Sequence, residues 1–281
     1  MKAVFAFDVM LIKDNMERVY SKGLFPYLIW ERYLKVFSEI TVLSRMTSDV
    51  DSSLTDKLNL SSGPRVSFHE IPNLSGPIAQ FTNRSKASDV ISKALAEADV
   101  LIARLPSDIG LLAINIAKKM NKPWAIELVS CPWDSYWNHG SLIGKIYAPW
   151  ITQRIRRIVS SSYYTLYVTE EFLQRRYPTK GFSASVSNVE LPSVSESILE
   201  KRMKRINLRD KVLNIGLIGY MSTNIKGIDT VLNAISTIQD SLPEFKLHFL
   251  GAGDPSKWET MSRKLGLFER CKFYEAIPSG E

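Results

Sequence analysis

The sequence predicts two α/β domains, each built on a parallel β-sheet covered by helices. Short apolar runs alternate with amphipathic stretches along the chain, which is the pattern of parallel strands joined by crossover helices. At 281 residues the chain exceeds the usual length of one domain. The alternation starts a second time near Asn188. We therefore place a first domain at residues 1–187 and a second at residues 188–281.

The first domain contains strands and helices that alternate, except that no helix is predicted between the strands at 40–43 and 66–71. Its helices carry apolar residues at helical spacing, as expected for helices that pack on a sheet. A Trp-rich loop is expected between the strand at 124–129 and the helix at 142–159. The predicted strands are residues 2–11, 40–43, 66–71, 99–105, 124–129 and 163–168, and the predicted helices are residues 24–37, 86–98, 112–120, 142–159 and 169–176.

The second domain begins with a charged connecting helix at residues 195–206. Strands at 213–219, 246–250 and 272–274 then alternate with helices at 226–239 and 257–265. Three strands with two helices between them make one half of a doubly wound domain. We therefore expect a C-terminally truncated second domain, with an unpaired sheet edge and an uncovered sheet face.

Composition restricts the partners and the location. The formal net charge of +7 predicts an acidic partner. Aromatic residues do not interleave with the basic ones as nucleic-acid recognition requires, so no nucleic-acid partner is expected. No apolar run reaches the length needed to cross a bilayer, and Asp8 interrupts the first apolar stretch, which excludes a signal peptide. Cys131 and Cys271 lie far apart and predict reduced thiols. A cytoplasmic protein is expected.

One segment favours peripheral attachment to an anionic membrane. Residues 149–159 alternate apolar and basic side chains, and Trp150 suits the headgroup boundary. The alternative is that Ile151, Ile155, Ile158 and Val159 face the sheet as ordinary core. Both interpretations fit the sequence.

A candidate phosphate site lies in the first strand-turn-helix of the second domain. Gly216 and Gly219 end the strand, and Lys226-Gly227 opens the helix. Free N–H groups converge at a helix N-terminus and its dipole favours negative charge, while a lysine adds a point charge. The alternative is a surface lysine beside a turn glycine.

A second glycine turn, Gly251-Ala252-Gly253-Asp254, follows the next strand. It holds two glycines of a dinucleotide fingerprint, but Ser256 stands at the position of the third, so the NAD signal is weak. Either a tight turn that lets a ligand approach the backbone or an ordinary strand-to-helix turn fits this pattern.

The candidate catalytic residues are Glu127, Asp134 and His139. They surround the end of a first-domain strand, where ligands bind in open α/β sheets. Aromatic side chains among them suit the apolar faces of sugar rings, and carboxylates accept hydrogen bonds from hydroxyls. An aromatic loop that caps the core is the alternative. The histidines and cysteines have no metal-ligand spacing, so no metal site is expected.

These motifs, in this order, resemble retaining glycosyltransferases of family four, which adopt the GT-B fold. That resemblance implies a complete N-terminal Rossmann-like domain on the acceptor side and an incomplete C-terminal Rossmann-like domain that binds the nucleotide sugar. The donor-domain likeness is carried by residues 212–234 (VLNIGLIGYMSTNIKGIDTVLNA), 247–254 (LHFLGAGD) and 265–278, and the interdomain likeness by residues 167–178 (YVTEEFLQRRYP) and 187–191.

The resemblance implies sugar transfer from a nucleotide diphosphate sugar, with retention at the anomeric carbon and without an obligatory metal. The nucleotide sugar is a substrate, so no cofactor is expected, and the acceptor is a glycan or lipid-linked glycan of polysaccharide or glycolipid synthesis. Lys226, beside Gly227, would hold the diphosphate and Gly219 would give it room. Gly251 and Gly253, with the backbone near Ile277 and Pro278, would line the nucleotide pocket.

Two positions depart from the family. Tyr220 stands where the family usually carries an arginine, and Val129 stands where many members have a histidine. The family's later segment with two glutamates would follow Glu281, so we expect little transferase activity from this chain. Two alternatives stay open: a non-catalytic remnant that binds an acceptor or partner, and a sugar-nucleotide epimerase.

Overall fold

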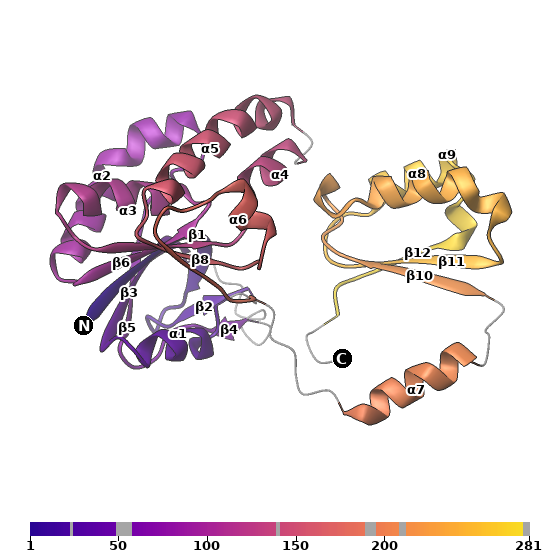
Figure 1. The fold of residues 1–281 in the computed structure, drawn as a ribbon, viewed down its shortest axis with the longest axis horizontal. Coiled ribbons are helices and arrows are strands. Elements are labelled where there is room, and N and C mark those ends of the chain that lie inside the picture. Colours follow the sequence, from indigo (N-terminus) through magenta and orange to yellow (C-terminus); the bar gives the residue numbers. More distant parts are fainter. Residues whose placement is uncertain (23–24, 49–57, 139–140, 189–194, 208–211, 278–281) are drawn as a thin grey trace. The chain divides into compact units, whose positions relative to one another are not determined.

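The computed structural model describes residues 1–22, 25–48, 58–138, 141–188, 195–207 and 212–277 (Figure 1). By internal contacts the chain divides into two compact units. The first comprises Met1–Pro132 and Thr152–Asn188, and the second comprises Trp133–Ile151 and Val189–Glu281. Both contain parallel sheets, so the predicted α/β class is confirmed.

A nine-stranded sheet forms the centre of the first unit. Its parallel strands lie in the order β5-β3-β1-β6-β7-β8-β9, so the strand order reverses at β1 as in a doubly wound fold. Two short strands extend the sheet at the end of β1: β2 pairs antiparallel with β1, and β4 pairs antiparallel with β2. The bounds are β1 Lys2–Lys13, β2 Val19–Ser21, β3 Glu39–Thr47, β4 Asn59–Leu60, β5 Val66–Glu70, β6 Val100–Leu105, β7 Trp124–Leu128, β8 Tyr164–Tyr167 and β9 Phe182–Ser185.

The core of this unit is built on β1, whose Phe5 is opposite Val42 of β3 and Ile102 of β6. The ring of Phe5 meets Trp30 edge-on at 5.2 Å, and Trp30 Nε1 donates a hydrogen bond to Ser61 Oγ at 3.0 Å. Central strands are apolar on both faces because helices cover both sides. The helices up to residue 188 are α1 Tyr27–Leu34, α2 Pro77–Ala96, α3 Asp108–Lys119, α4 Pro132–Trp137, α5 Leu142–Ser160 and α6 Phe172–Arg176. Of these, nearly all of α4 and the first half of α5 fall in Trp133–Ile151, which is counted with the second unit.

Most predicted elements of the first unit are confirmed, and the differences are local. The Trp-rich stretch is not a loop, because residues 132–137 form α4. Helix α2 begins at Pro77 instead of near Lys86. The strands β2, β4 and β9 were not predicted, since each has only two to four residues. Pairing with a neighbouring strand, not local propensity, makes them strands.

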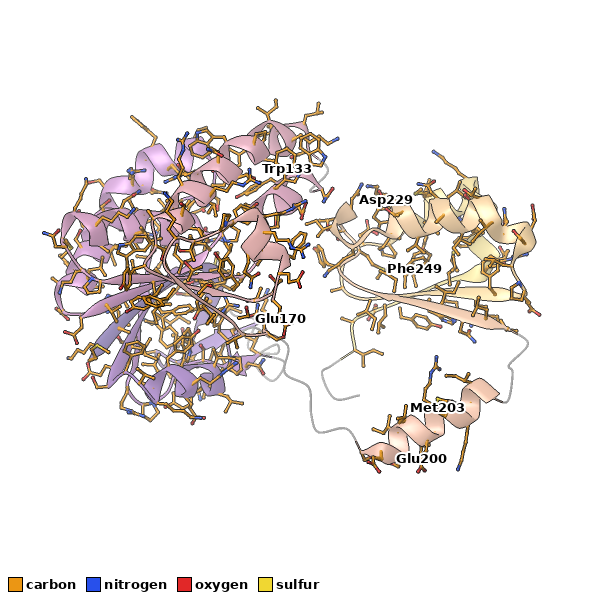
Figure 2. All side chains as sticks on the ribbon, viewed as in Figure 1. Trp133, Glu170, Glu200, Met203, Asp229 and Phe249 are labelled. Atoms are coloured by element: carbon orange, nitrogen blue, oxygen red, sulfur yellow. The ribbon has the colours of Figure 1, made fainter. Side chains whose placement is uncertain are left out.

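The second unit contains a three-stranded parallel sheet in the order β10-β11-β12. Its core joins side chains from α8 and α9 to the sheet, with Phe249 at its centre (Figure 2). The strands are β10 Leu213–Ile218, β11 Phe245–Leu250 and β12 Cys271–Tyr274; the helices are α7 Glu196–Asn207, α8 Ile228–Ile238 and α9 Ser256–Lys264; the 3-10 turns are η2 Asn224–Lys226, η3 Gln239–Ser241 and η4 Phe268–Arg270.

Helices α8 and α9 lie on the same side of this small sheet (Figure 1). On the other side, His248 Nε2 donates a hydrogen bond to Asn214 Oδ1 at 2.9 Å, and its Nδ1 accepts one from the Tyr274 hydroxyl at 3.0 Å. Asn214 and Tyr274 are exposed. One face of the sheet is therefore apolar and packed, and the other is polar.

Candidate functional site

The two glycine turns predicted to form a ligand site are in direct contact at the carboxyl ends of β10 and β11. The Gly219 N–H donates to the Leu250 carbonyl at 2.9 Å, and the Met221 N–H donates to the Ala252 carbonyl at 2.8 Å. A Cβ on Gly251 would stand 2.0 Å from the Gly219 carbonyl oxygen. The close approach of the two turns therefore requires glycine at position 251.

Gly253 closes the second turn with a φ of +103°, a conformation that favours glycine. A Cβ there would lie 2.6 Å from Ser222 Oγ and 2.8 Å from the Ser222 backbone nitrogen. The same Ser222 hydroxyl accepts a hydrogen bond from the Asp254 N–H at 3.0 Å. Ser222 was not among the predicted site residues, and it links the turn after β10 to the turn after β11.

Lys226 lies over the first glycine turn. A Cβ on Gly219 would be 2.4 Å from Cγ of Lys226, so the lysine stem packs against this glycine. The prediction that Lys226 opens the helix is wrong. Lys226 belongs to the 3-10 turn η2, because Gly227 takes a left-handed φ of +69° between this turn and α8. Helix α8 then starts at Ile228 without a side-chain cap.

The N-terminus of α8 and Lys226 lie next to each other in the chain and are the candidate anion site, whose binding of an anion stays a prediction. The N–H groups of a first helical turn lack intrahelical partners and the helix dipole is positive there. Asp229 lies in this first turn (Figure 2), where its carboxylate favours the helix but competes with a bound anion. The exposed Lys226 amine supplies a positive charge beside it.

A buried tryptophan holds the turn after β10 in place. Trp258 of α9 is fully buried, and its Nε1 donates a hydrogen bond to the Met221 carbonyl at 2.5 Å. The neighbouring Lys257 Nζ donates to Asn224 Oδ1 at 2.5 Å. Helix α9 thus anchors both ends of the segment between β10 and η2, a role that sequence periodicity alone does not reveal.

We expect Gly251→Ala to lower the free energy of unfolding by about 1–3 kcal/mol, the usual cost of overpacking. The added Cβ would press on the Gly219 carbonyl and force the two turns apart. Urea denaturation followed by circular dichroism measures the change. Gly216→Ala is the matched control, because a Cβ at Gly216 would meet no atom within 4 Å. Equal effects of the two substitutions would contradict the close packing of the turns.

Glu127, predicted as a catalytic residue, lies in a buried polar cluster at the end of β7. The Tyr33 hydroxyl donates to Glu127 Oε1 at 2.6 Å, and Arg104 Nη1 pairs with Oε2 at 3.2 Å. Burial raises the pKa of Glu127, while Tyr33 and Arg104 act in the opposite direction. Burial, together with the nearby carboxylate, also raises the pKa of Tyr33. Both carboxylate oxygens are therefore engaged inside the first unit.

Arg104 and Tyr33 were not predicted as partners of Glu127. Arg104 and Glu127 are paired in register on β6 and β7, and the Arg104 guanidinium also lies over the rings of Phe7 and Phe25, at 5.4 Å and 5.2 Å. The sequence does carry a signal for this pair: Arg104 and Glu127 are charged residues, each near the end of an otherwise apolar strand. A buried charge needs an opposite charge nearby, so each implied the other.

The aromatic segment after β7 packs on itself. Trp133 and Trp137 stack with ring centroids 4.9 Å apart, and Tyr136 meets Tyr147 edge-on at the same distance. Asp134 lies half-buried in the first turn of α4. His139 and Pro278 lie outside the described residues. The catalytic role of Asp134 and His139 stays a prediction.

Comparison with known proteins finds one relative by sequence and several solved structures of similar fold. No protein-family model matches the chain. It is 31% identical over 259 residues to "Protein CapJ" of Staphylococcus aureus, an alignment that covers 92% of this chain. The chain spans only 62% of that relative's length.

Two solved structures are similar over 99% of the chain. They are the lipopolysaccharide outer core galactosyltransferase WaaB in its apo form (19% identity, TM-score 0.52, 69% of that chain covered) and WaaG, a glycosyltransferase involved in lipopolysaccharide biosynthesis (12% identity, TM-score 0.51, 70% covered). At these identities the likeness bears on architecture alone. It confirms the predicted fold class: this chain has the α/β fold of GT-B glycosyltransferases.

Proposed function

We propose that this protein transfers a sugar from a nucleotide diphosphate sugar to a glycan or lipid-linked glycan, with retention of the anomeric configuration. The observation that carries the proposal is the contact of the Gly219 and Gly251 turns beside Lys226 and the uncapped N-terminus of α8. GT-B enzymes bind a nucleotide sugar in the domain that carries such turns, and this chain has their fold.

In the proposed reaction, the donor diphosphate lies at the N-terminus of α8. Negative charge develops on the diphosphate as the bond to the sugar breaks. The first N–H groups of α8 are fixed before the reaction, so they stabilise this charge without reorganising, and the Lys226 amine adds a positive charge. Gly219 lets the Lys226 stem lie over the first turn, and Gly251 lets the two turns approach each other. The donor is a substrate, and no cofactor takes part.

Lys226→Ala is expected to weaken the binding of UDP or GDP about ten- to a hundredfold. Losing a charged hydrogen-bond partner costs roughly 1.5–3 kcal/mol. Isothermal titration calorimetry on the chain and on the variant measures the change. Lys264→Ala, which removes an exposed lysine at the end of α9, is the matched control and should leave the affinity unchanged. An unchanged affinity in Lys226→Ala would contradict the assignment of this lysine.

Product analysis with labelled nucleotide sugars tests the reaction itself. A transferred sugar whose anomeric configuration matches the donor, determined by NMR, supports the proposal. An isomerised donor without transfer would identify an epimerase instead. Donor binding without either product would indicate a non-catalytic binding protein. The chain is assayed beside a version that carries a relative's C-terminal segment, because the whole protein's activity is what is proposed.

The proposal includes peripheral attachment of the protein to an anionic membrane. In α5, Ile151, Ile155 and Val159 are buried, so the core interpretation of these residues is correct. The exposed apolar group lies earlier in the helix: Leu142, Ile143, Ile146 and Trp150 are between 53% and 80% exposed. These positions share one helical face, and an exposed Lys145 lies among them. No helix in the described residues is long and apolar enough to cross a membrane.

Ile143→Ser with Ile146→Ser is expected to reduce binding to vesicles of phosphatidylglycerol at least fivefold. Each removed apolar side chain contributes about 1.5–3 kcal/mol when fully buried in an apolar medium, and less at an interface. Vesicle sedimentation at low and high salt gives the affinity. The control is Ile78→Ser, which removes an equally exposed isoleucine from α2. Binding that is absent, or unaffected by both salt and the substitutions, would exclude this membrane contact.

A further inference from the structure

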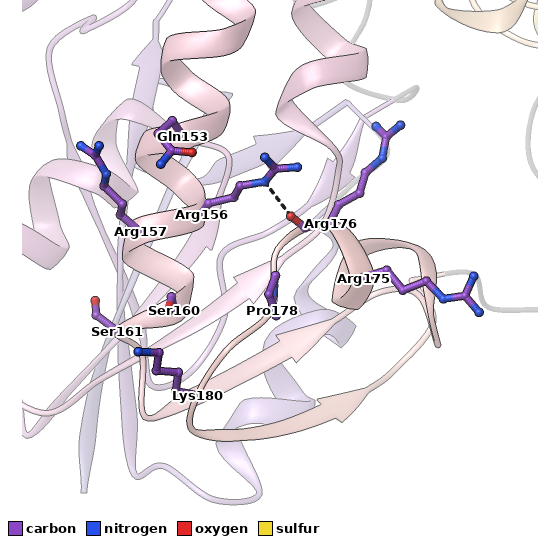
Figure 3. Close-up of a pocket in the computed structure, with 9 residues that line it drawn as sticks. All are labelled: Gln153, Arg156, Arg157, Ser160, Ser161, Arg175, Arg176, Pro178 and Lys180. Carbon is purple, nitrogen blue, oxygen red and sulfur yellow. Dashed lines mark hydrogen bonds between the residues drawn. The ribbon is translucent and has the colours of Figure 1, made fainter.

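An open pocket on the first unit is lined by five cationic side chains (Figure 3). Its volume is about 740 Å³. None of its described lining residues is acidic, so the pocket offers a positive potential to a ligand. The lining residues are Gln153, Arg156, Arg157, Ser160 and Ser161 at the end of α5, and Arg175, Arg176, Pro178 and Lys180 from α6 and the segment before β9.

The cations of this pocket are held to different degrees. Arg156 is oriented by the protein, since its Nε donates to the Arg176 carbonyl at 2.8 Å and its guanidinium lies over the Tyr177 ring. Arg175 is paired with Glu171 at 2.5 Å. Arg157 and Lys180 are exposed, and no ion pair joins either to a carboxylate within the part of the chain that the structure describes. These two have their charges available to a ligand.

A cluster of exposed aromatic rings continues the same surface. A second hollow shares Ser160, Ser161 and Lys180 with the first, and Tyr163 and Phe182 complete its wall. Tyr163, Tyr164 and Phe182 are each more than half exposed. Phe182 meets Tyr163 edge-on at 5.3 Å and stacks with Tyr164 at 5.8 Å. Contiguous exposed rings of this kind mark binding surfaces.

This surface lies at the amino ends of the parallel strands, whereas the acceptor site was predicted at their carboxyl ends. Tyr164 and Phe182 are the first paired residues of β8 and β9, so the aromatic cluster is at the amino ends of these parallel strands. Glu127 is near the carboxyl end of the neighbouring β7. A ligand in the hollow is therefore remote from the carboxyl ends of the same sheet, and its role is attachment and not reaction.

We propose that this surface binds an acidic glycan chain, with carboxylate or phosphate groups of the glycan in the basic pocket and sugar rings on the aromatic cluster. Arginine forks match carboxylate and phosphate oxygens, and aromatic faces match the apolar faces of sugars. An isolated phosphate ion would leave the rings unused. The cations line a hollow that continues into the aromatic cluster, so a chain of acidic sugars can contact both at once. The proposal concerns binding alone and stands whether or not the chain transfers sugar.

Fluorescence polarisation with labelled oligogalacturonate tests the proposal on the whole chain. It should bind at least tenfold more tightly than a malto-oligosaccharide of equal length, and the difference should shrink with added salt. Arg157→Ala with Lys180→Ala should weaken oligogalacturonate binding at least tenfold. Phe182→Ala should weaken it as well, but leave the binding of inorganic phosphate unchanged. All three side chains are exposed, so the variants should unfold at the same urea concentration as the wild type.

Lys201→Ala with Lys204→Ala is the matched control, since it removes two exposed lysines from α7. It should leave oligogalacturonate binding unchanged, and so should Lys226→Ala, which separates this site from the donor site. Equal binding of acidic and neutral oligosaccharides would overturn the proposal. So would binding that survives loss of Arg157 and Lys180. Phosphatidylglycerol vesicles that bind through these residues when oligogalacturonate does not would show a lipid-docking surface instead.

Discussion

Glu127→Ala is expected to lower the free energy of unfolding by about 3–5 kcal/mol, the typical cost of removing one partner of a buried ion pair. Arg104 is only 17% exposed, and the variant would leave its charge without a carboxylate. Tyr33 would lose its 2.6 Å acceptor at the same time. Urea denaturation followed by circular dichroism measures the loss.

Two further variants separate a structural role for Glu127 from a catalytic one. Glu127→Gln keeps an acceptor for Tyr33 and should recover part of the stability. Glu170→Ala, which removes an exposed glutamate of the same unit, should change the unfolding free energy by less than about 0.5 kcal/mol. If Glu127→Ala is as stable as the wild type but abolishes sugar transfer, the carboxylate is catalytic and the cluster does not support the fold.

Trp258→Ala is expected to lower the free energy of unfolding by about 3–5 kcal/mol and to weaken UDP or GDP binding in the same protein. The indole fills the core under the β10 turn and its Nε1 holds the Met221 carbonyl. Without it, the turn that carries Gly219 loses its anchor on α9. Denaturation and calorimetry on the same preparation give both quantities.

Comparison with Trp258→Phe separates the loss of stability due to the missing apolar volume from the loss due to the missing hydrogen bond. Phenylalanine keeps most of the apolar volume but removes the hydrogen-bond donor, so a loss of about 0.5–1.5 kcal/mol is expected from the missing bond. Lys226→Ala, by contrast, should weaken nucleotide binding at unchanged stability. A Trp258→Ala variant that binds UDP or GDP normally would show that the β10 turn is shaped without α9.

The sequence by itself predicted the α/β class and most of its long elements. Strands such as β1 and β6 are apolar on both faces, and helices such as α3 carry apolar residues at a period of 3.6, so both are readable within a short window. The glycine turns after β10 and β11 and the lysine beside them were also predicted from the sequence. A tight turn favours glycine and a phosphate site favours a positive charge, and both residue types are visible in the sequence itself.

Only the tertiary structure showed which of these residues meet. Gly219 contacts Gly251, and Glu127 contacts Tyr33, although the members of each pair are far apart in the sequence. The structure also shows which residues of α5 are exposed and which are buried. Strand β9 exists because β8 offers it a hydrogen-bonding edge, although its own residues are all exposed. Periodicity is a property of neighbouring residues, whereas register and packing depend on partners that are distant in the chain. For this reason the sequence indicated the two glycine turns and the lysine of the proposed donor site, but not the contact between the turns.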